Sequence, residues 1–308
     1  KLHDVNKKIK FVLTGSSSKL LSKEISTTLR GRVLNKEIFP LSFKEIVSWK
    51  KIKYDIRTLP HSNDRIEIKK LFNAYIKDGG YPALIFQKVN SEEILQNYYE
   101  SMIFKDLVER HKIEDVKKIR ILANLLMESV SKDISYNNLA NKLKSMGMNT
   151  SKNTIIEYIS YFEDAYLFFQ NLKYEYSLGK QLGSIKKVYF IDNGMLNAIS
   201  FKFSEDRGKL LENIVFLELR RKGKKVFYNR DNHECDFLIL EKEKIVEAIQ
   251  VSEKITMDNK QREVNGLFEA LNKFKLKEGI IITLDEEESI DIEGKKIKLI
   301  PVWKWLLQ

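Results

Sequence analysis

The spacing of apolar residues changes along the chain, and each change predicts a different kind of structure. An early apolar run, Ile9–Leu13, is typical of a central parallel strand, and a second short strand is predicted over 34–39. Ser42 followed by Glu45 predicts a helix that opens with a capping box. Over 91–128 apolar residues recur about every 3.6 positions, which predicts an almost continuous helical stretch.

The middle of the chain has the pattern of a helix-turn-helix. Two short helices are predicted over 137–144 and 151–162, with a glycine-containing turn between them. Alternating segments at 167–176 and 187–191 follow, as expected for the two strands of a β-wing. We therefore expect a winged helix-turn-helix over 131–203.

The last region, 204–308, has the alternation of an α/β domain. The acidic run 285–288 is expected to be a solvated loop. The expected elements, in order, are a helix over 209–221, strands over 225–228, 235–240 and 245–251, a helix over 257–274, strands over 279–284 and 296–301, and a helical turn over 303–307.

Composition narrows the class of protein. The 308 residues are 43% hydrophobic and 31% charged, which is globular and leaves room for several domains. A single cysteine excludes a disulfide framework and a cysteine-based zinc site. No uncharged run approaches the ~18 residues of a membrane span. We expect a soluble, cytoplasmic protein with no membrane partner.

The positive charge is concentrated at one end. Residues 1–60 hold 14 Lys or Arg against 5 Asp or Glu, within a total net charge of +11. This excess suggests a surface that meets phosphate, nucleic acid or an acidic partner, and a solubilising lysine-rich face is the alternative. Because the chain opens on Lys1 and soon reaches an apolar strand, we expect it to be the later part of a longer protein.

The sequence has no phosphate-binding loop. The pattern G-x-x-x-x-G-K-S/T does not occur, and no apolar strand ends in a paired acid of Walker B type. We therefore expect no ATP turnover from this chain alone.

Several motifs in order carry a family resemblance. The segments 11–17, 29–32 and 39–45 resemble the second half of the ATPase core of the archaeal-type AAA+ ATPases. Further motifs resemble the uncharacterised C-terminal region that accompanies those ATPases, and they lie at 79–82, 187–194, 208–221, 234–237, 250–251, 262–263 and 303–307. The resemblance covers essentially the whole chain.

The resemblance implies an organisation and a nucleotide site. Residues 1–58 would be the C-terminal part of the AAA+ core and 59–130 a helical lid. Ser16 and Ser17 would stand at the sensor position that faces the γ-phosphate, and Arg32 would be an arginine finger or sensor arginine. ATP and Mg²⁺ would bind only together with the missing N-terminal core, the main expected partner, and a homo-oligomer is left open.

The predicted helix-turn-helix offers residues suited to DNA. Lys152, Asn153 and Thr154 open its second helix, where phosphate and base-edge contacts are made. DNA is therefore an expected partner, and the alternative is a protein-binding or lid module without DNA contact.

The order of elements in 204–308 resembles the PD-(D/E)XK nuclease fold. Asp236 matches its first carboxylate and Glu212 the acid often found on the preceding helix, and we expect this pair of carboxylates to hold Mg²⁺ only weakly. Where that fold needs Glu-x-Lys, this chain has Gln250 and Ser252. Asp236, Glu212 and Gln250 are thus expected to form a nuclease-like pocket that is catalytically inactive.

Two alternatives stay open for this α/β region. One is an active Mg²⁺-dependent DNA nuclease, and the other is a non-enzymatic DNA-binding or scaffold protein. The inactive-pocket hypothesis requires Asp236 and Gln250 on neighbouring strands with converging side chains. Cys235, directly before Asp236 in the sequence, is expected to be a small buried apolar residue.

Overall fold

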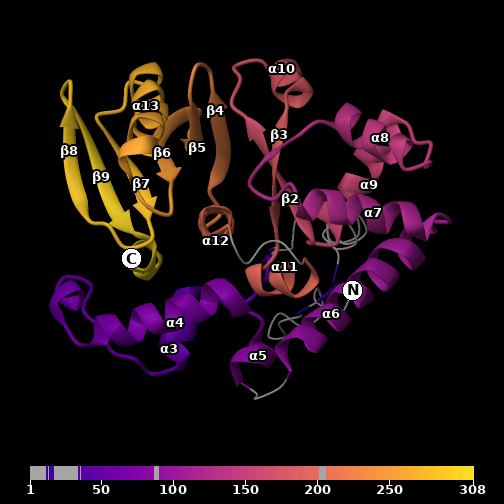
Figure 1. Cartoon of the computed structure of the whole chain (residues 1–308), viewed down its shortest axis with the longest axis horizontal. Helices are drawn as coiled ribbons and strands as arrows, with labels where there is room; N and C mark the ends of the chain where they lie inside the picture. The colour runs from indigo at the N-terminus through magenta and orange to yellow at the C-terminus, as the bar shows by residue number, and fades with distance from the viewer. Residues whose placement is uncertain (1–11, 13, 17–33, 35, 87–89, 201–205) are drawn as a thin grey trace, which may run out of the picture.

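The protein is a mixed α/β structure built on one large sheet (Figure 1). The computed structural model describes residues 12, 14–16, 34, 36–86, 90–200 and 206–308. Within these residues nine strands form a single sheet in the order β1-β3-β2-β4-β5-β6-β7-β9-β8. The sheet spans the molecule in Figure 1, from the yellow β8–β9 hairpin to the helices α7, α8 and α9 at the opposite side.

The strands of the sheet run in mixed directions. The pairs β2–β4, β6–β7 and β7–β9 are parallel, and the other neighbours are antiparallel. The strands are β1 (Asp133–Ile134), β2 (Phe168–Lys173), β3 (Lys186–Phe190), β4 (Lys225–Arg230), β5 (Glu234–Glu241), β6 (Lys244–Val251), β7 (Glu278–Thr283), β8 (Glu288–Ile292) and β9 (Lys295–Pro301).

Helices cover both faces of the C-terminal half of the sheet. On one face lie α12 (Arg207–Arg221) and α14 (Val302–Leu307), whose apolar residues share a core with Phe237 and Ile249. On the other face lies α13 (Met257–Lys273), which packs with Leu238 and Ala248. Period-two alternation of β5 and β6 supplies both cores, since successive side chains point to opposite faces.

The sheet continues beyond the predicted α/β region. β2 pairs with β4 in parallel through Leu172 opposite Phe227 and Lys173 opposite Tyr228. The β2–β3 hairpin therefore belongs to the same sheet as β5 and β6, although the sequence pattern predicted a separate unit ending at residue 203.

Two helices joined by a turn precede this hairpin. α8 (Tyr136–Ser145) and α9 (Lys152–Asp164) are joined by a turn in which Gly147 has a positive φ of 79°. Ser151 caps α9, because its hydroxyl accepts a hydrogen bond from the Thr154 N–H. Between β2 and β3 the chain forms a short helix, α10 (Leu178–Gly183).

The remaining helices lie below and beside the sheet in Figure 1. They are α3 (Phe43–Trp49), the 3₁₀ turn η1 (Leu59–His61), α4 (Asp64–Asp78), α5 (Pro82–Phe86), α6 (Ser91–Ser101), the π-helix η2 (Met102–Glu109), α7 (Val116–Met127) and α11 (Asn193–Ile199). The capping box predicted for Ser42 and Glu45 at α3 is confirmed. None of the helices in the described ranges is long and apolar enough to cross a bilayer.

Several predicted elements are wrong or incomplete. The almost continuous helical stretch predicted over 91–128 is confirmed, with one break between η2 and α7, where Lys112 has a positive φ of 51°. Among 34 and 36–39, the described part of the second predicted strand, no residue is in a strand. The loop predicted for 285–288 ends earlier than expected, because Glu288 already opens β8. The strand predicted over 9–13 lies almost wholly outside the described residues.

Candidate functional site: a buried acidic cluster and an exposed helix-turn-helix

Three elements bring buried charges together at the centre of the sheet. β3 carries Lys187, α12 carries Glu212 and β5 carries Asp236, and these residues are only 1%, 9% and 4% exposed. The alternation of β3 directs Lys187 and Tyr189 to one face, where the Tyr189 ring stacks on Phe216 of α12 at 4.0 Å. This stacking sets Glu212, one turn earlier on α12, beside β3.

The lysine ammonium group occupies the centre of this arrangement. Lys187 Nζ lies 3.0 Å from Glu212 Oε1 and 2.8 Å from Asp236 Oδ1, and it also pairs with Glu234. The Tyr189 hydroxyl donates to Glu212 Oε1 at 2.7 Å. We call Lys187, Glu212, Glu234 and Asp236 the Lys187 cluster.

The second oxygen of Asp236 is also engaged. Asp236 Oδ2 accepts a hydrogen bond of 2.9 Å from the backbone N–H of Val251 on the neighbouring strand. Each carboxylate oxygen of Asp236 therefore has a protein donor, which is how a buried carboxylate avoids the cost of lost hydration.

The cluster shifts the pKa of its members in the directions expected from burial and charge. Burial opposes the charge on Lys187, but the carboxylates of Asp236 and Glu212 outweigh it and raise its pKa well above the usual value. Burial raises the pKa of Glu212 to about 7, against the lowering effect of Lys187. Burial, and then the charge of Glu212, also raises the pKa of Tyr189. Lys187 is thus a cation at neutral pH, whereas Glu212 titrates there.

Gln250 lies next to Asp236, but its side chain is engaged elsewhere. Its Oε1 accepts a bond of 3.2 Å from the Asp236 backbone N–H, and its Nε2 donates to Glu263 Oε2 of α13 at 2.7 Å. The other oxygen of Glu263 is paired with Arg262. Gln250 therefore connects β6 to α13, while the Asp236 carboxylate faces Lys187. The Ser252 hydroxyl donates to the Lys254 carbonyl at 3.1 Å.

The two predicted magnesium ligands, Asp236 and Glu212, are thus already paired with a cation of the protein, Lys187. Mg²⁺ requires oxygen ligands at ~2.1 Å with near-octahedral geometry, and two carboxylates that share one lysine do not offer it. In the part of the chain that the structure describes, no three His, Cys, Asp or Glu side chains are arranged to hold a metal ion. The residues present fit an internal lysine better than a resident Mg²⁺.

Lys187 and its strand neighbour Asn171 were not among the predicted site residues. Asn171 lies opposite Lys187 in the β2–β3 register and is 1% exposed. Neither its amide nitrogen nor its amide oxygen has a hydrogen-bond partner within the described residues. The available signal was a charged residue at the head of the apolar run Val188–Ile191, whose alternation places it on the buried face.

Three motifs of the family resemblance meet next to the cluster. Asp192 Oδ2 accepts a bond of 2.7 Å from the Gly80 N–H, and the Gly80 carbonyl in turn accepts one of 2.7 Å from Leu41. Gly79 has a positive φ of 75°, and a Cβ there would overlap the Asp192 carboxylate. A Cβ on Gly194 would overlap the Asp78 carbonyl. The glycines are required by this close approach.

A buried asparagine pair extends this junction to α12. Asn213 is fully buried and bonds both the N–H and the carbonyl of Phe190, at 2.8 and 2.9 Å. It also donates to Asn193 Oδ1 at 2.9 Å, and Asn193 donates to the Leu210 carbonyl. Because every one of these groups is satisfied, the motifs at 79–82, 187–194 and 208–221 have a structural role here.

The residues predicted to contact DNA lie at the start of α9. Lys152 and Asn153 are exposed, and Thr154 is half-buried with its hydroxyl 3.0 Å from that of Ser151. The arrangement leaves the side chains of Lys152 and Asn153 available at a helix N-terminus, where the helix dipole favours an anion.

Comparison with known proteins places the chain in a family. The uncharacterized protein MJ1544 of Methanocaldococcus jannaschii is 41% identical over 308 residues, which cover 96% of this chain and 68% of that protein. An uncharacterized protein of Haemophilus influenzae is 31% identical over 299 residues, which cover 96% of this chain and 70% of that protein. A family model described as "AAA domain" matches residues 1–47, and one described as "Domain of unknown function (DUF4143)" matches 207–305. The chain belongs to this AAA ATPase-related family.

The AAA ATPase-related family has an uncharacterised C-terminal region, as expected from the motifs. Another family model, "Domain of unknown function (DUF8612)", matches residues 69–206, so the β2–β4 pairing joins two separately defined family regions. A further relative, uncharacterized protein MJ1637 of Methanocaldococcus jannaschii, is 26% identical over 326 residues, covering 96% of this chain and 64% of that protein. The chain spans about two thirds of the length of these relatives. No solved structure matches.

The AAA-matched segment is described only in part. Ser16 is exposed, donates to Asp106 Oδ1 at 2.7 Å and accepts from Arg110 at 3.1 Å. Ser17 and Arg32, the other two residues expected to sense nucleotide, lie outside the described residues.

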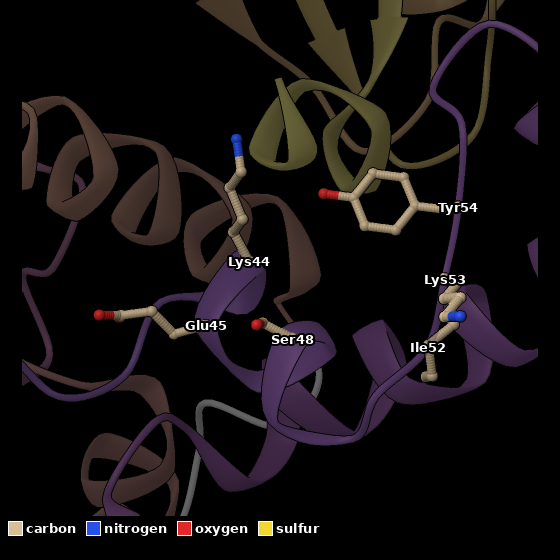
Figure 2. A pocket seen from close by; sticks show the side chains of 6 residues that line it. All are labelled: Lys44, Glu45, Ser48, Ile52, Lys53 and Tyr54. Carbon is tan, nitrogen blue, oxygen red and sulfur yellow. The ribbon is translucent and has the colours of Figure 1, made fainter.

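A surface hollow of about 520 Å³ lies beside α3, and its lining does not converge on a chemical site (Figure 2). Lys44 donates to the carbonyl of Gln308 and Tyr54 to that of Leu307, so both hold the C-terminal helix α14. Glu45 belongs to the capping box and points away from Tyr54 in Figure 2. The hollow is where α3 meets α14.

Proposed function

We propose that this chain is the DNA-contacting part of an AAA ATPase-related protein, and that its α/β part is a nuclease-like scaffold that does not cleave DNA. The observation that carries the proposal is the exposed start of α9, with Lys152 and Asn153 beside the β2–β3 hairpin. Two helices followed by an antiparallel hairpin are the arrangement of a winged helix, in which the second helix enters the major groove.

The chemistry of these side chains suits DNA. A lysine supplies a cation to a backbone phosphate, and an asparagine amide can donate to and accept from a base edge. α9 carries one cation, Lys152, and the exposed carboxylate of Glu157 on the same helix limits its positive charge. Binding is therefore expected to be sequence-tolerant and to depend on salt.

The absence of cleavage is proposed from the Lys187 cluster. Phosphodiester hydrolysis by this type of fold needs a Mg²⁺ ion held by strand carboxylates and a lysine that orients the attacking water. Here the strand that should supply both has Gln250 and Ser252, and the Asp236 and Glu212 carboxylates are held by Lys187. No observation favours the active-nuclease alternative, which the cleavage assay below would reveal.

Fluorescence anisotropy with a short labelled duplex tests DNA binding. The logarithm of the association constant should fall linearly with the logarithm of salt concentration, by ~0.9 per phosphate contacted. Lys152→Ala should weaken binding to every sequence tested. Lys296→Ala is the matched control, because Lys296 is exposed on β9 at the far end of the sheet in Figure 1. Affinity that does not change with salt would contradict the proposal.

A plasmid-nicking assay tests the scaffold role. The native chain in Mg²⁺ or Mn²⁺ should leave the plasmid intact, as should Asp236→Ala. Nicking by the native chain that disappears in Asp236→Ala would establish the nuclease alternative instead. A gain of activity in Gln250→Glu with Ser252→Lys needs Glu263→Gln as well, since a glutamate at 250 would face Glu263 at the 2.7 Å contact.

Nucleotide is proposed to bind only when the remainder of an AAA core is present. The family match to an AAA domain at 1–47 supports the link to ATP chemistry, and this sequence contains no phosphate-binding loop. A phosphate-release assay on this chain should show no turnover. Turnover that is lost in Arg32→Ala would overturn this expectation.

A further inference from the structure

A recess of about 160 Å³ lies where the starts of α8 and α9 meet the segment 182–186. Its apolar wall is formed by Ile156, Leu182 and Ile185, which are 39%, 57% and 49% exposed. Its polar wall includes Lys152 and Lys186. We call this feature the α9 recess.

Lys186 is a buried cation without a carboxylate partner. It is 5% exposed, and its Nζ donates to the carbonyls of Leu182 at 2.8 Å and Ser184 at 2.6 Å. Nζ also lies 4.8 Å from the centre of the Tyr136 ring. Within the described ranges no Asp or Glu oxygen is within the 4.0 Å ion-pair distance of Lys186 or Lys152.

The two lysines repel one another across the recess. Burial and then the charge of Lys152 lower the pKa of Lys186 from its usual value. An ammonium group has three donors, and two of those of Lys186 are taken by carbonyls, which leaves one available. An anion between Lys152 and Lys186 would remove the repulsion and use that donor.

The apolar wall of the recess and its place beside α9 favour an anion that carries an apolar group next to its negative charge. Leu182 and Ile185 offer apolar surface next to the cations, as a ligand with both a phosphate and an apolar sugar face requires. The N-terminus of α9, with exposed Lys152 and Asn153, borders the same recess. A continuous run of phosphates and sugars passing the start of α9 matches both walls.

We propose that the α9 recess binds one phosphate of a DNA backbone between Lys152 and Lys186, with the adjoining deoxyribose against Leu182 and Ile185. This inference rests on the proposed DNA binding and adds a specific phosphate position to it. It assigns a role to Lys186, Leu182 and Ile185, which no sequence motif marks.

The test is a salt titration of duplex binding by charge and apolar variants. Lys186→Met should lower the steepness of the salt dependence by ~0.9, the contribution of one phosphate contact, and Lys186→Arg should restore it. Leu182→Ser should weaken binding and leave the salt dependence unchanged. Thermal unfolding of Lys186→Met should remain cooperative.

A second variant avoids the buried position. Leu182→Glu places a negative charge at the rim of the recess on an exposed side chain, and it should weaken binding and reduce the salt dependence. Ile66→Glu is the matched control, since Ile66 is 72% exposed on the distant helix α4. It should change neither quantity beyond its contribution to net charge.

The outcomes separate this inference from the proposed function. If the native chain binds duplex and Lys152→Ala weakens it, but Lys186→Met and Leu182→Glu do not, the recess is not a phosphate position while DNA binding stands. If the native chain binds no duplex at low salt, both fail. Competition by inorganic phosphate at constant ionic strength should be weak, and strong competition would show a site for free phosphate instead.

Discussion

Two consecutive lysines of β3 have opposite surroundings. Lys186 and Lys187 are 5% and 1% exposed, and strand alternation directs them to opposite faces. Lys187 is paired with three carboxylates, and their charges raise its pKa. Lys186 is held by two carbonyls beside a second lysine, and its pKa is lowered.

The difference separates a structural charge from an available one. A buried ion whose partners are all within the protein gains nothing from a ligand, because its hydration is already replaced. A buried ion without a countercharge gains when an anion arrives. In the region that looks like a nuclease, the buried lysine is therefore fully partnered by carboxylates within the protein, whereas the buried lysine of the region without a catalytic motif has no countercharge.

The largest expected effect is a difference in the free energy of unfolding between variants of the two lysines. Lys187→Met leaves Glu212 and Asp236 without their cation and is expected to lower the free energy of unfolding by about 3–5 kcal/mol. Lys186→Met removes a cation that has no countercharge, so the change is expected to be below about 1 kcal/mol. Urea unfolding at neutral pH measures both. Equal losses in the two variants would contradict the comparison.

Measuring the free energy of unfolding as a function of pH should show where the Glu212 carboxyl loses its proton. Its folded pKa of about 7 is above its usual value, so the folded state binds more protons than the unfolded state between these two values. The free energy of unfolding should therefore fall as pH rises from about 5 to about 8, and Glu212→Gln should flatten the profile by roughly 2–3 kcal/mol over that range.

The control for this series is a second buried carboxylate. Burial raises the pKa of Asp192 to about 6, so part of the slope should persist in Glu212→Gln. If the free energy of unfolding of Glu212→Gln falls with pH as steeply as that of the native protein, the pH dependence belongs to Asp192. The prediction that Glu212 titrates near neutral pH would then be wrong.

The local sequence pattern predicted the strands that carry the Lys187 cluster, but it did not predict how these strands pair in the sheet. The predicted strands over 235–240 and 245–251 exist as β5 and β6, because alternation and a charged turn are local signals. The β2–β4 pairing joins residues far apart in the chain, and no local pattern specifies it. The position of Lys187 between Glu212 and Asp236 depends on that arrangement and could not be derived from spacing.

Short elements were missed for a different reason. α10 and α11 have six and seven residues, too few for a helical period to be visible. Asp192 precedes α11 as its N-cap, and its carboxylate accepts hydrogen bonds from the N–H groups of Met195 and Gly80. The motif around Asp192 was found in the sequence, whereas its structural purpose required the partner glycine.

A metal titration should test whether Lys187 occupies the place of a cation. Native protein should show no change of melting temperature with Mn²⁺ at constant ionic strength. In Lys187→Met the freed carboxylates of Glu212 and Asp236 should bind Mn²⁺ and recover about 1 kcal/mol of stability. Lys298→Met, which breaks only a surface pair with Glu278, is the control that should not respond. Recovery in the control would show a nonspecific effect of the ion.

The smallest expected effect concerns Asn171, the neighbour of Lys187 with no hydrogen-bond partner within the described residues. A buried amide without partners costs about 1–3 kcal/mol, and leucine has nearly the same shape. Asn171→Leu should therefore raise the free energy of unfolding by about 1 kcal/mol. Asn213→Leu is the matched comparison, because Asn213 is equally buried but bonded to Phe190 and Asn193, and it should lower stability. Loss of stability in Asn171→Leu would mean that the amide holds a bound water or ligand beside Lys187. The surroundings of Lys187 would then include a bound group, as proposed for the α9 recess, and the two lysines would differ less than the comparison states.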